Sequence, residues 1–192
     1  RIHYKKTDQV TMSLAVRAFA AGDKDETALK ILGIILGGSM SSRLFIDLRE
    51  RHGLAYHVRT LTELSSDAGF LNTRAGVPLN KLETAIKIIL SEYKKICLEP
   101  VKARELKKAK DFFISHLALQ LESSDDITSF YGRQVVMPKK IITPAELKRQ
   151  ISRVSVADIQ RVAKRIFVNR GLNLALIGGL KSQAQLKKIL KF

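Results

Sequence analysis

The hydrophobic residues of this 192-residue chain change their spacing along the sequence. Residues 9–20 alternate between apolar and polar, which predicts a strand with one face on a core. The apolar side of that strand consists of Val10, Met12, Leu14, Val16 and Ala18. Residues 25–36 instead place apolar side chains almost all round a helix, so we expect a buried helix that Gly37 and Gly38 end. A chain with both patterns side by side must pack helices against a sheet.

The two spacings continue to the end of the chain. Residues 54–64 and 69–77 alternate on either side of a Ser65-Ser66-Asp67 turn and predict a hairpin. Residues 172–177 predict a last strand. We expect further helices over residues 41–51 and 101–137, the second of them interrupted at 123–126. Other helices are expected to begin at Asn80, at Thr143, at Ser155 and at about Ser182. Glu83 completes a capping box with Asn80, and the helix from Ser155 ends at Phe167.

These elements predict an α+β fold with two layers. We expect a mostly antiparallel sheet of four or more strands, with helices packed on one face. The open face, which carries Thr11, Ser13, Arg17 and Arg59, is polar enough to meet water or a partner surface. A chain of this length is expected to form one domain over residues 1–192. Because it begins with an arginine and not with Met, we expect it to be processed or to be part of a longer protein.

The chain is strongly basic, with 34 Lys and Arg against 18 Asp and Glu and a formal net charge of +16. Such a balance suggests binding to nucleic acid. However, the basic residues are dispersed, mostly in the second half, and no aromatic residues interleave with them to stack on bases. We therefore interpret them as solvated helix faces that attract acidic partners, and expect no nucleic acid. The longest uncharged apolar run, residues 31–40, is too short to span a membrane.

Metal ligands and catalytic nucleophiles are sparse. The four histidines show neither H-E-x-x-H nor H-x-x-E-H spacing, so no metal site is expected in this chain. The single cysteine, Cys97, excludes an internal disulfide and lies on the apolar side of its predicted helix, where a thiol normally packs in the core. No G-x-S-x-G nucleophile motif occurs.

The segment from Gly37 to Tyr56 is the most informative part of the sequence. It runs from a double glycine through a short predicted helix to another glycine and a strand, with Arg49 near the helix end and Tyr56 seven residues later. A helix end followed by a turn brings a guanidinium and a phenol toward one spot, where they offer donors to a peptide carbonyl or an oxyanion. The alternative is that Arg49 stabilises the helix C-terminus and Tyr56 packs half-buried.

Three stretches resemble a known family. They are "GGSMSSRLFIDLRERHGLAYHV", "DAGFLNTRAGV" and "SSDDITSFYGRQ". Together they are similar to the second-half domain of insulinase-like (pitrilysin-type) zinc peptidases, and closest in pattern to mitochondrial processing peptidases and their bacterial relatives. The resemblance covers nearly the whole chain, from the first predicted strand to "LNLALIGGL".

This resemblance implies a function for the segment. In such enzymes homologous α+β domains enclose an extended peptide, and the first half binds zinc through H-x-x-E-H and a downstream glutamate. The second half supplies an arginine and a tyrosine that reach the substrate backbone, and these match Arg49 and Tyr56. The family's glycine-rich turn matches Gly37, Gly38 and Ser39, which are candidate substrate contacts. The zinc-binding half is absent from this chain, so we expect no hydrolysis by the chain alone.

The resemblance therefore implies a peptide substrate, a zinc-binding half in the same polypeptide or in another subunit, and assembly as a homodimer or heterodimer. Zinc is expected in that other half, with no cofactor in this chain. A non-catalytic scaffold or peptide-binding subunit of the same family is the alternative, and a basic nucleic-acid module is a third interpretation. If the chain is bacterial, the resemblance implies a soluble protein of the cytoplasm or periplasm.

Overall fold

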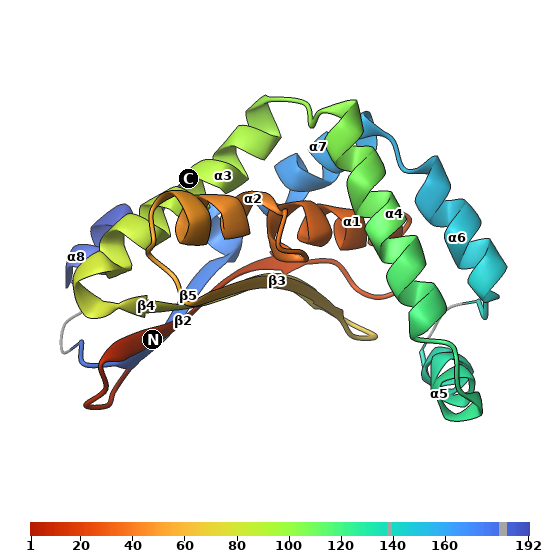
Figure 1. Cartoon of the computed structure of the whole chain (residues 1–192), viewed down its shortest axis with the longest axis horizontal. Coiled ribbons are helices and arrows are strands. Elements are labelled where there is room, and N and C mark those ends of the chain that lie inside the picture. The colour runs from red at the N-terminus through yellow and green to blue at the C-terminus, as the bar shows by residue number, and fades with distance from the viewer. Residues whose placement is uncertain (138–139, 181–183) are drawn as a thin grey trace.

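A curved five-stranded sheet carries helices on one face only (Figure 1). The computed structural model describes residues 1–137, 140–180 and 184–192. The strands lie in the order β1-β5-β2-β4-β3, and all described pairings are antiparallel except that of β1 with β5. The strands are β1 (Ile2–Tyr4), β2 (Gln9–Ala18), β3 (His57–Leu64), β4 (Gly69–Pro78) and β5 (Leu172–Gly178). The predicted α+β class and the mostly antiparallel sheet are thereby confirmed.

The helices follow the predicted segments closely. A short helix, α2, continues directly into a π-helical segment, η1, as one rod before β3. The predicted helix at 101–137 is interrupted as expected, because Ser123 accepts a hydrogen bond from the Asp126 amide and begins a new helix. The bounds are α1 (Glu26–Gly37), α2 (Arg43–Phe45), η1 (Ile46–Arg51), α3 (Leu82–Leu98), α4 (Ala103–Leu119), α5 (Ser124–Val135), α6 (Pro144–Arg153), α7 (Val156–Ile166) and α8 (Ala184–Ile189).

The core lies between the sheet and the first layer of helices. Every second residue of β2, from Val10 to Val16, is fully buried, as its alternation predicts. These side chains share one apolar cluster with those of α1, α3 and α7. Full burial of one Leu, Ile or Val side chain contributes about 1.5–3 kcal/mol, so this layer contact is the main source of stability.

A chain of buried hydroxyl groups joins the sheet to α3. The Tyr93 hydroxyl lies 2.6 Å from Thr73 Oγ1, which lies 2.7 Å from Thr60 Oγ1. Burial raises the pKa of the Tyr93 hydroxyl far above its ordinary value. The Tyr93 ring stacks on Phe167 with ring centroids 4.3 Å apart. Each buried hydroxyl thus has a partner, so the row of polar groups is accommodated within an apolar core.

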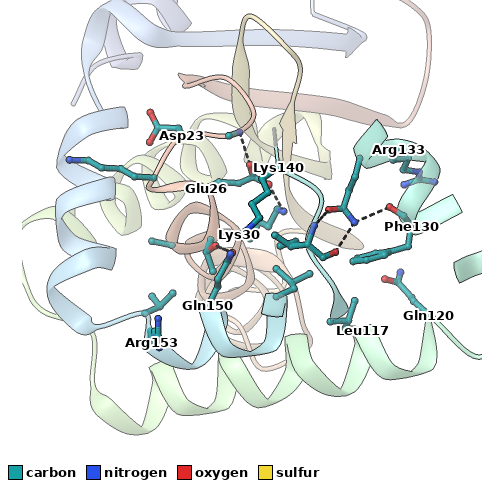
Figure 2. A pocket seen from close by; sticks show the side chains of 18 of the residues that line it. Asp23, Glu26, Lys30, Leu117, Gln120, Phe130, Arg133, Lys140, Gln150 and Arg153 are labelled. Carbon is teal, nitrogen blue, oxygen red and sulfur yellow. Dashed lines mark hydrogen bonds and ion pairs between the residues drawn. The ribbon is translucent and has the colours of Figure 1, made fainter. Parts of the chain in front are cut away.

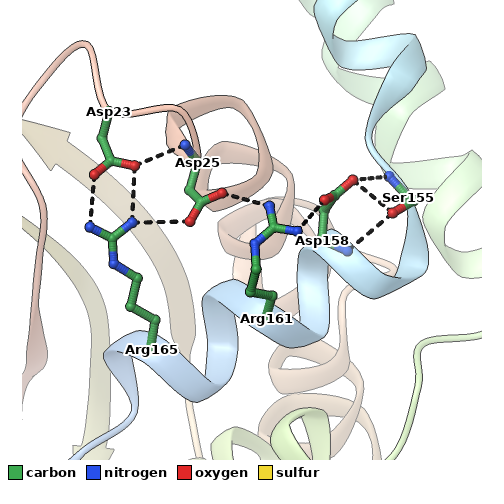
Figure 3. A network of polar contacts seen from close by, with 6 residues as sticks. All are labelled: Asp23, Asp25, Ser155, Asp158, Arg161 and Arg165. Atoms are coloured by element: carbon green, nitrogen blue, oxygen red, sulfur yellow. Dashed lines mark hydrogen bonds and ion pairs between the residues drawn. The ribbon is translucent and has the colours of Figure 1, made fainter.

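An ionic network fastens the start of α1 to α7 (Figure 3). Arg165 donates to Asp23 at 2.7 and 3.0 Å and to Asp25 at 3.0 Å. Arg161 donates to Asp25 at 2.6 Å and also binds Asp158. The Asp25 side chain is only 2% exposed, so these two arginines supply the partners that a buried carboxylate requires.

Two features differ from the sequence expectation. Strand β1 was not predicted, because three residues are too short to show a period and its parallel partner β5 lies at the other end of the chain. The expected capping box at Asn80 and Glu83 is wrong. Helix α3 begins at Leu82 after a 3-10 turn over residues 79–81, and no side chain caps it. The helix starts predicted at Thr143 and Ser155 are confirmed, and the structure forms a capping box at each. The expected start at Ser182 lies outside the described residues.

Candidate functional site

The site segment begins where α1 passes close to β3. At Gly37 a Cβ atom would lie 2.3 Å from Thr60 Oγ1 and 2.7 Å from the Thr60 nitrogen. Gly37 is buried, and any larger residue would push the helix end off the strand. At Gly38 a Cβ atom would lie 2.6 Å from Ile34 Cα. Packing alone therefore requires both glycines, and only Gly38 is partly exposed.

Hydrogen bonds within the loop that follows order its serines. The Ser42 hydroxyl donates to the Ser39 carbonyl at 2.5 Å, and the Ser39 and Ser41 hydroxyls lie 3.2 Å apart. Ser39 is partly exposed, and the neighbouring Met40 is 78% exposed. The loop thus presents polar groups and one apolar side chain at the surface directly before α2.

Arg43 anchors the short helix. Its Nε and Nη2 donate to the two carboxylate oxygens of Glu105 at 2.7 and 2.8 Å, and its Nη1 lies 3.8 Å from Glu92. The bonds to Glu105 raise the pKa of the Arg43 guanidinium. This residue ties α2 to α3 and α4 and so fixes the rod that carries Arg49. Sequence reasoning missed it, because its partners lie on distant helices and leave no local pattern.

A tight turn returns the chain from the rod to the sheet. The Leu54 and Ala55 amides both donate to the Leu48 carbonyl, at 2.7 and 3.2 Å. Gly53 has φ +56°, a left-handed conformation that favours glycine. The Tyr56 amide then donates to the Gly76 carbonyl at 3.1 Å, which places Tyr56 beside β4 just before β3 begins.

The turn brings the guanidinium of Arg49 to the backbone of Tyr56. Arg49 Nη1 donates to the Tyr56 carbonyl at 3.3 Å, and its guanidinium carbon lies 5.1 Å from the centre of the Phe45 ring. Arg49 is exposed and the Tyr56 residue is 65% exposed. The exposure of Tyr56 argues against the alternative that its ring packs half-buried. Both side chains are accessible at one edge of the sheet.

The structure offers no group of three or more His, Cys, Asp or Glu side chains that could hold a metal ion, among the residues it describes. Cys97 is half-buried, and burial raises the pKa of its thiol, so the group stays protonated at pH 7. None of the helices in the described ranges is long and apolar enough to cross a bilayer.

Comparisons with known proteins extend these observations. The family model described as "Peptidase M16 inactive domain" matches residues 1–113. The chain is 29% identical over 163 residues to an uncharacterized zinc protease of Bacillus subtilis, covering 85% of this chain and 40% of that protein. The chain thus spans well under half the length of this relative.

Two solved structures share the fold. A protease from Helicobacter pylori superposes with a TM-score of 0.85 at 23% identity, over 93% of this chain and 43% of that one. A peptidase M16 inactive domain from Pseudomonas fluorescens gives 0.84 at 18% identity, over 94% and 43%. At these identities the likeness concerns the fold alone, and it agrees with the two-layer architecture described above.

Proposed function

The chain belongs to the peptidase M16 family, as one of its inactive domains, and on that premise we propose that it is the half of a zinc metalloendopeptidase that holds the peptide without binding zinc. The zinc-binding half, in the same polypeptide or in a second subunit, supplies the metal and the activated water. The length of the B. subtilis relative supports this division, because 40% of that protein corresponds to this chain.

The observation that carries the proposal is the placement of Arg49 beside Tyr56. The guanidinium contacts the Tyr56 backbone carbonyl, and both residues are exposed. Such a pair offers several hydrogen-bond donors to one peptide backbone. In our proposal Arg49 and Tyr56 orient the scissile peptide and donate to the oxyanion that forms when water attacks its carbonyl.

The glycine-rich turn contributes in two ways. Gly38 and Ser39 are partly exposed at the start of the rod, so they are candidate contacts for the peptide. Gly37 is buried against Thr60, so it acts by letting α1 approach β3 and thereby sets the position of the loop. The extended peptide itself pairs with a strand edge of the zinc half.

The test uses the complete enzyme with both halves present. We expect Tyr56→Phe and Arg49→Ala each to lower kcat/KM by about 10²–10³, because each removes a donor to the transition state. The zinc content, measured by atomic absorption, stays unchanged.

Matched controls are Tyr4→Phe and Arg104→Ala, which alter exposed residues outside the segment. They should leave kcat/KM within about twofold of the wild type. Unaltered kinetics in the Tyr56 and Arg49 variants would refute their role. A complete protein that binds no zinc and cleaves no peptide would favour the non-catalytic scaffold.

A further inference from the structure

A cavity of about 790 Å³ is lined by no residue of the segment from Gly37 to Tyr56 (Figure 2). Its walls come from the start of α1, the end of α4, from α5 and α6, and from α7, and neither Arg49 nor Tyr56 lines it. A second depression of about 250 Å³ adjoins it and shares four lining residues. These are Lys140, Ile142, Gln150 and Arg153. Because they share these residues, the two form one groove large enough for a ligand of several residues.

Part of the lining is apolar. Leu117, Phe130, Ile142 and Leu147 contribute hydrophobic side chains from four successive segments of the chain. Gln134 holds two of these segments together, because its side chain accepts from the Ile142 amide at 2.9 Å and donates to the Phe130 carbonyl at 3.3 Å. Hydrogen bonds of Gln134 therefore fix the relative positions of the segments that carry Phe130 and Ile142.

The carboxylates of the larger cavity are already engaged within the chain. The pairs are Asp23 with Arg165, Glu26 with Lys30, Asp126 with Ser123, and Asp158 with Ser155 and Arg161. The lowered pKa values of Asp23 and Asp158 follow from these bonds. Carboxylates held in this way are poorly available to bind a cationic ligand.

Two cations of the larger cavity, Lys30 and Arg161, take part in these ion pairs, whereas other cations of the groove do not. The side chains of Arg133, Lys140 and Arg153 form no hydrogen bond or ion pair with any described residue, and neither does that of Arg149 in the adjoining depression. Lys140 and Arg149 do help to lower the pKa of Glu146, which lines the same depression, so Arg133 and Arg153 are the cations most available to a ligand. Arg133 and Arg153 lie on opposite sides of the cavity, with Lys140 between them (Figure 2). Because these charges are spread along the groove, they suit a ligand with several separated negative charges.

We propose that this groove binds an acidic peptide segment that also carries apolar side chains. The carboxylates of the segment pair with Arg133, Arg149 and Arg153. Each guanidinium can donate two parallel hydrogen bonds to one carboxylate. Its apolar side chains cover Leu117, Phe130 and Ile142. The inference goes beyond the proposed peptidase role and does not depend on it, because it concerns binding by this chain itself.

The test measures binding of a fluorescein-labelled peptide of about eight residues that alternates Glu and Leu, long enough when extended to follow the groove. We expect saturable binding by fluorescence anisotropy at about 50 mM salt, weakened at about 200 mM because the charges are exposed. The Arg133→Gln, Arg153→Gln double variant should bind about tenfold more weakly, which corresponds to about 1.4 kcal/mol.

The matched control is the Arg104→Gln, Arg170→Gln double variant, which removes two exposed arginines that lie outside the groove and form no ion pair with any described residue. It lowers the net charge equally and should change the affinity less than about twofold. Equal loss in both double variants would overturn the proposal, since binding would then follow net charge alone. It is also overturned if a Lys-Leu peptide or a single-stranded oligonucleotide binds the groove as tightly, or if the Glu-Leu peptide fails to bind at about 1 mM.

Discussion

Gly37 is the residue at which α1 meets β3, and its missing side chain sets the separation between them. The Thr60 backbone nitrogen lies in the path of any Cβ atom at this position, and Thr60 itself is buried. The strand is held in the sheet by its pairing with β4, which restricts its movement away from the helix. The close approach positions both the loop that follows and the rod that carries Arg49.

We expect Gly37→Ala to lower the free energy of unfolding by about 1–3 kcal/mol, the usual cost of overpacking a well-packed contact. Gly132→Ala is the matched control, because in α5 a Cβ atom at that position meets nothing within 4 Å. That change should stabilise the protein by about 0.5–1 kcal/mol through the higher helix propensity of Ala. Urea unfolding of both variants measures the difference. Equal stability of Gly37→Ala and the wild type would show that α1 and β3 can move apart at no cost in free energy, which would contradict the prediction.

At the level of single residues, contacts between residues close together in the sequence could be predicted, whereas contacts between residues far apart in the sequence could not. The spacing of Arg49 and Tyr56 across a turn was visible, and the structure brings the Arg49 guanidinium to the Tyr56 backbone. The ion pair of Arg43 with Glu105 was invisible, because 62 residues separate the partners. The same holds for Gly37, whose steric reason lies on a strand that had not been placed beside it.

Among the elements, α6 and α7 show how strongly local chemistry sets a helix start. Thr143 with Glu146 and Ser155 with Asp158 both form reciprocal capping boxes. Hydrogen bonds from Ser155, together with Arg161, lower the pKa of the Asp158 carboxyl to about 2. Because this pKa is depressed in the folded state, its stabilising effect is complete above the unfolded value and is lost as the pH falls toward 2.

We expect Asp158→Asn to lower the free energy of unfolding by about 1 kcal/mol at pH 7, a value that allows for solvent screening of a partly exposed group. The difference from the wild type should shrink as the pH falls below about 4. Urea titrations over this pH range provide the measurement. Asp67→Asn in the exposed hairpin turn serves as the control, with an expected change of less than about 0.5 kcal/mol. A loss in Asp158→Asn that stays constant with pH would contradict the ionic origin of the effect.

Elements with a long or repeated pattern were predictable, and short or weakly patterned ones were not. Strands β2 and β4 carry ten residues each, enough to show their alternation. Strand β1 has three residues, and its parallel pairing with β5 depends on where the far end of the chain lies. The expected cap at Asn80 failed because an extra 3-10 turn precedes α3 and moves its start to Leu82.

For the molecule as a whole, the layer arrangement followed from the polarity of the strands. The apolar positions of β2 face the helices, whereas Thr11 and Arg17 on the other face are exposed, so helices cover one side only (Figure 1). The groove could not be predicted, since its walls come from segments between residues 22 and 161 that meet only in the folded chain. Its unpaired arginines were visible only as part of a dispersed basic excess.

The central claim is that Tyr56 touches the peptide that the zinc half cleaves. The most direct measurement replaces Tyr56 with the photo-crosslinking residue benzoylphenylalanine in the complete, zinc-depleted enzyme and irradiates it with a labelled peptide substrate. We predict covalent capture of the peptide at position 56, and none above background when the same residue replaces the exposed Tyr4. Equal capture at the two positions, or none at position 56, would contradict the account.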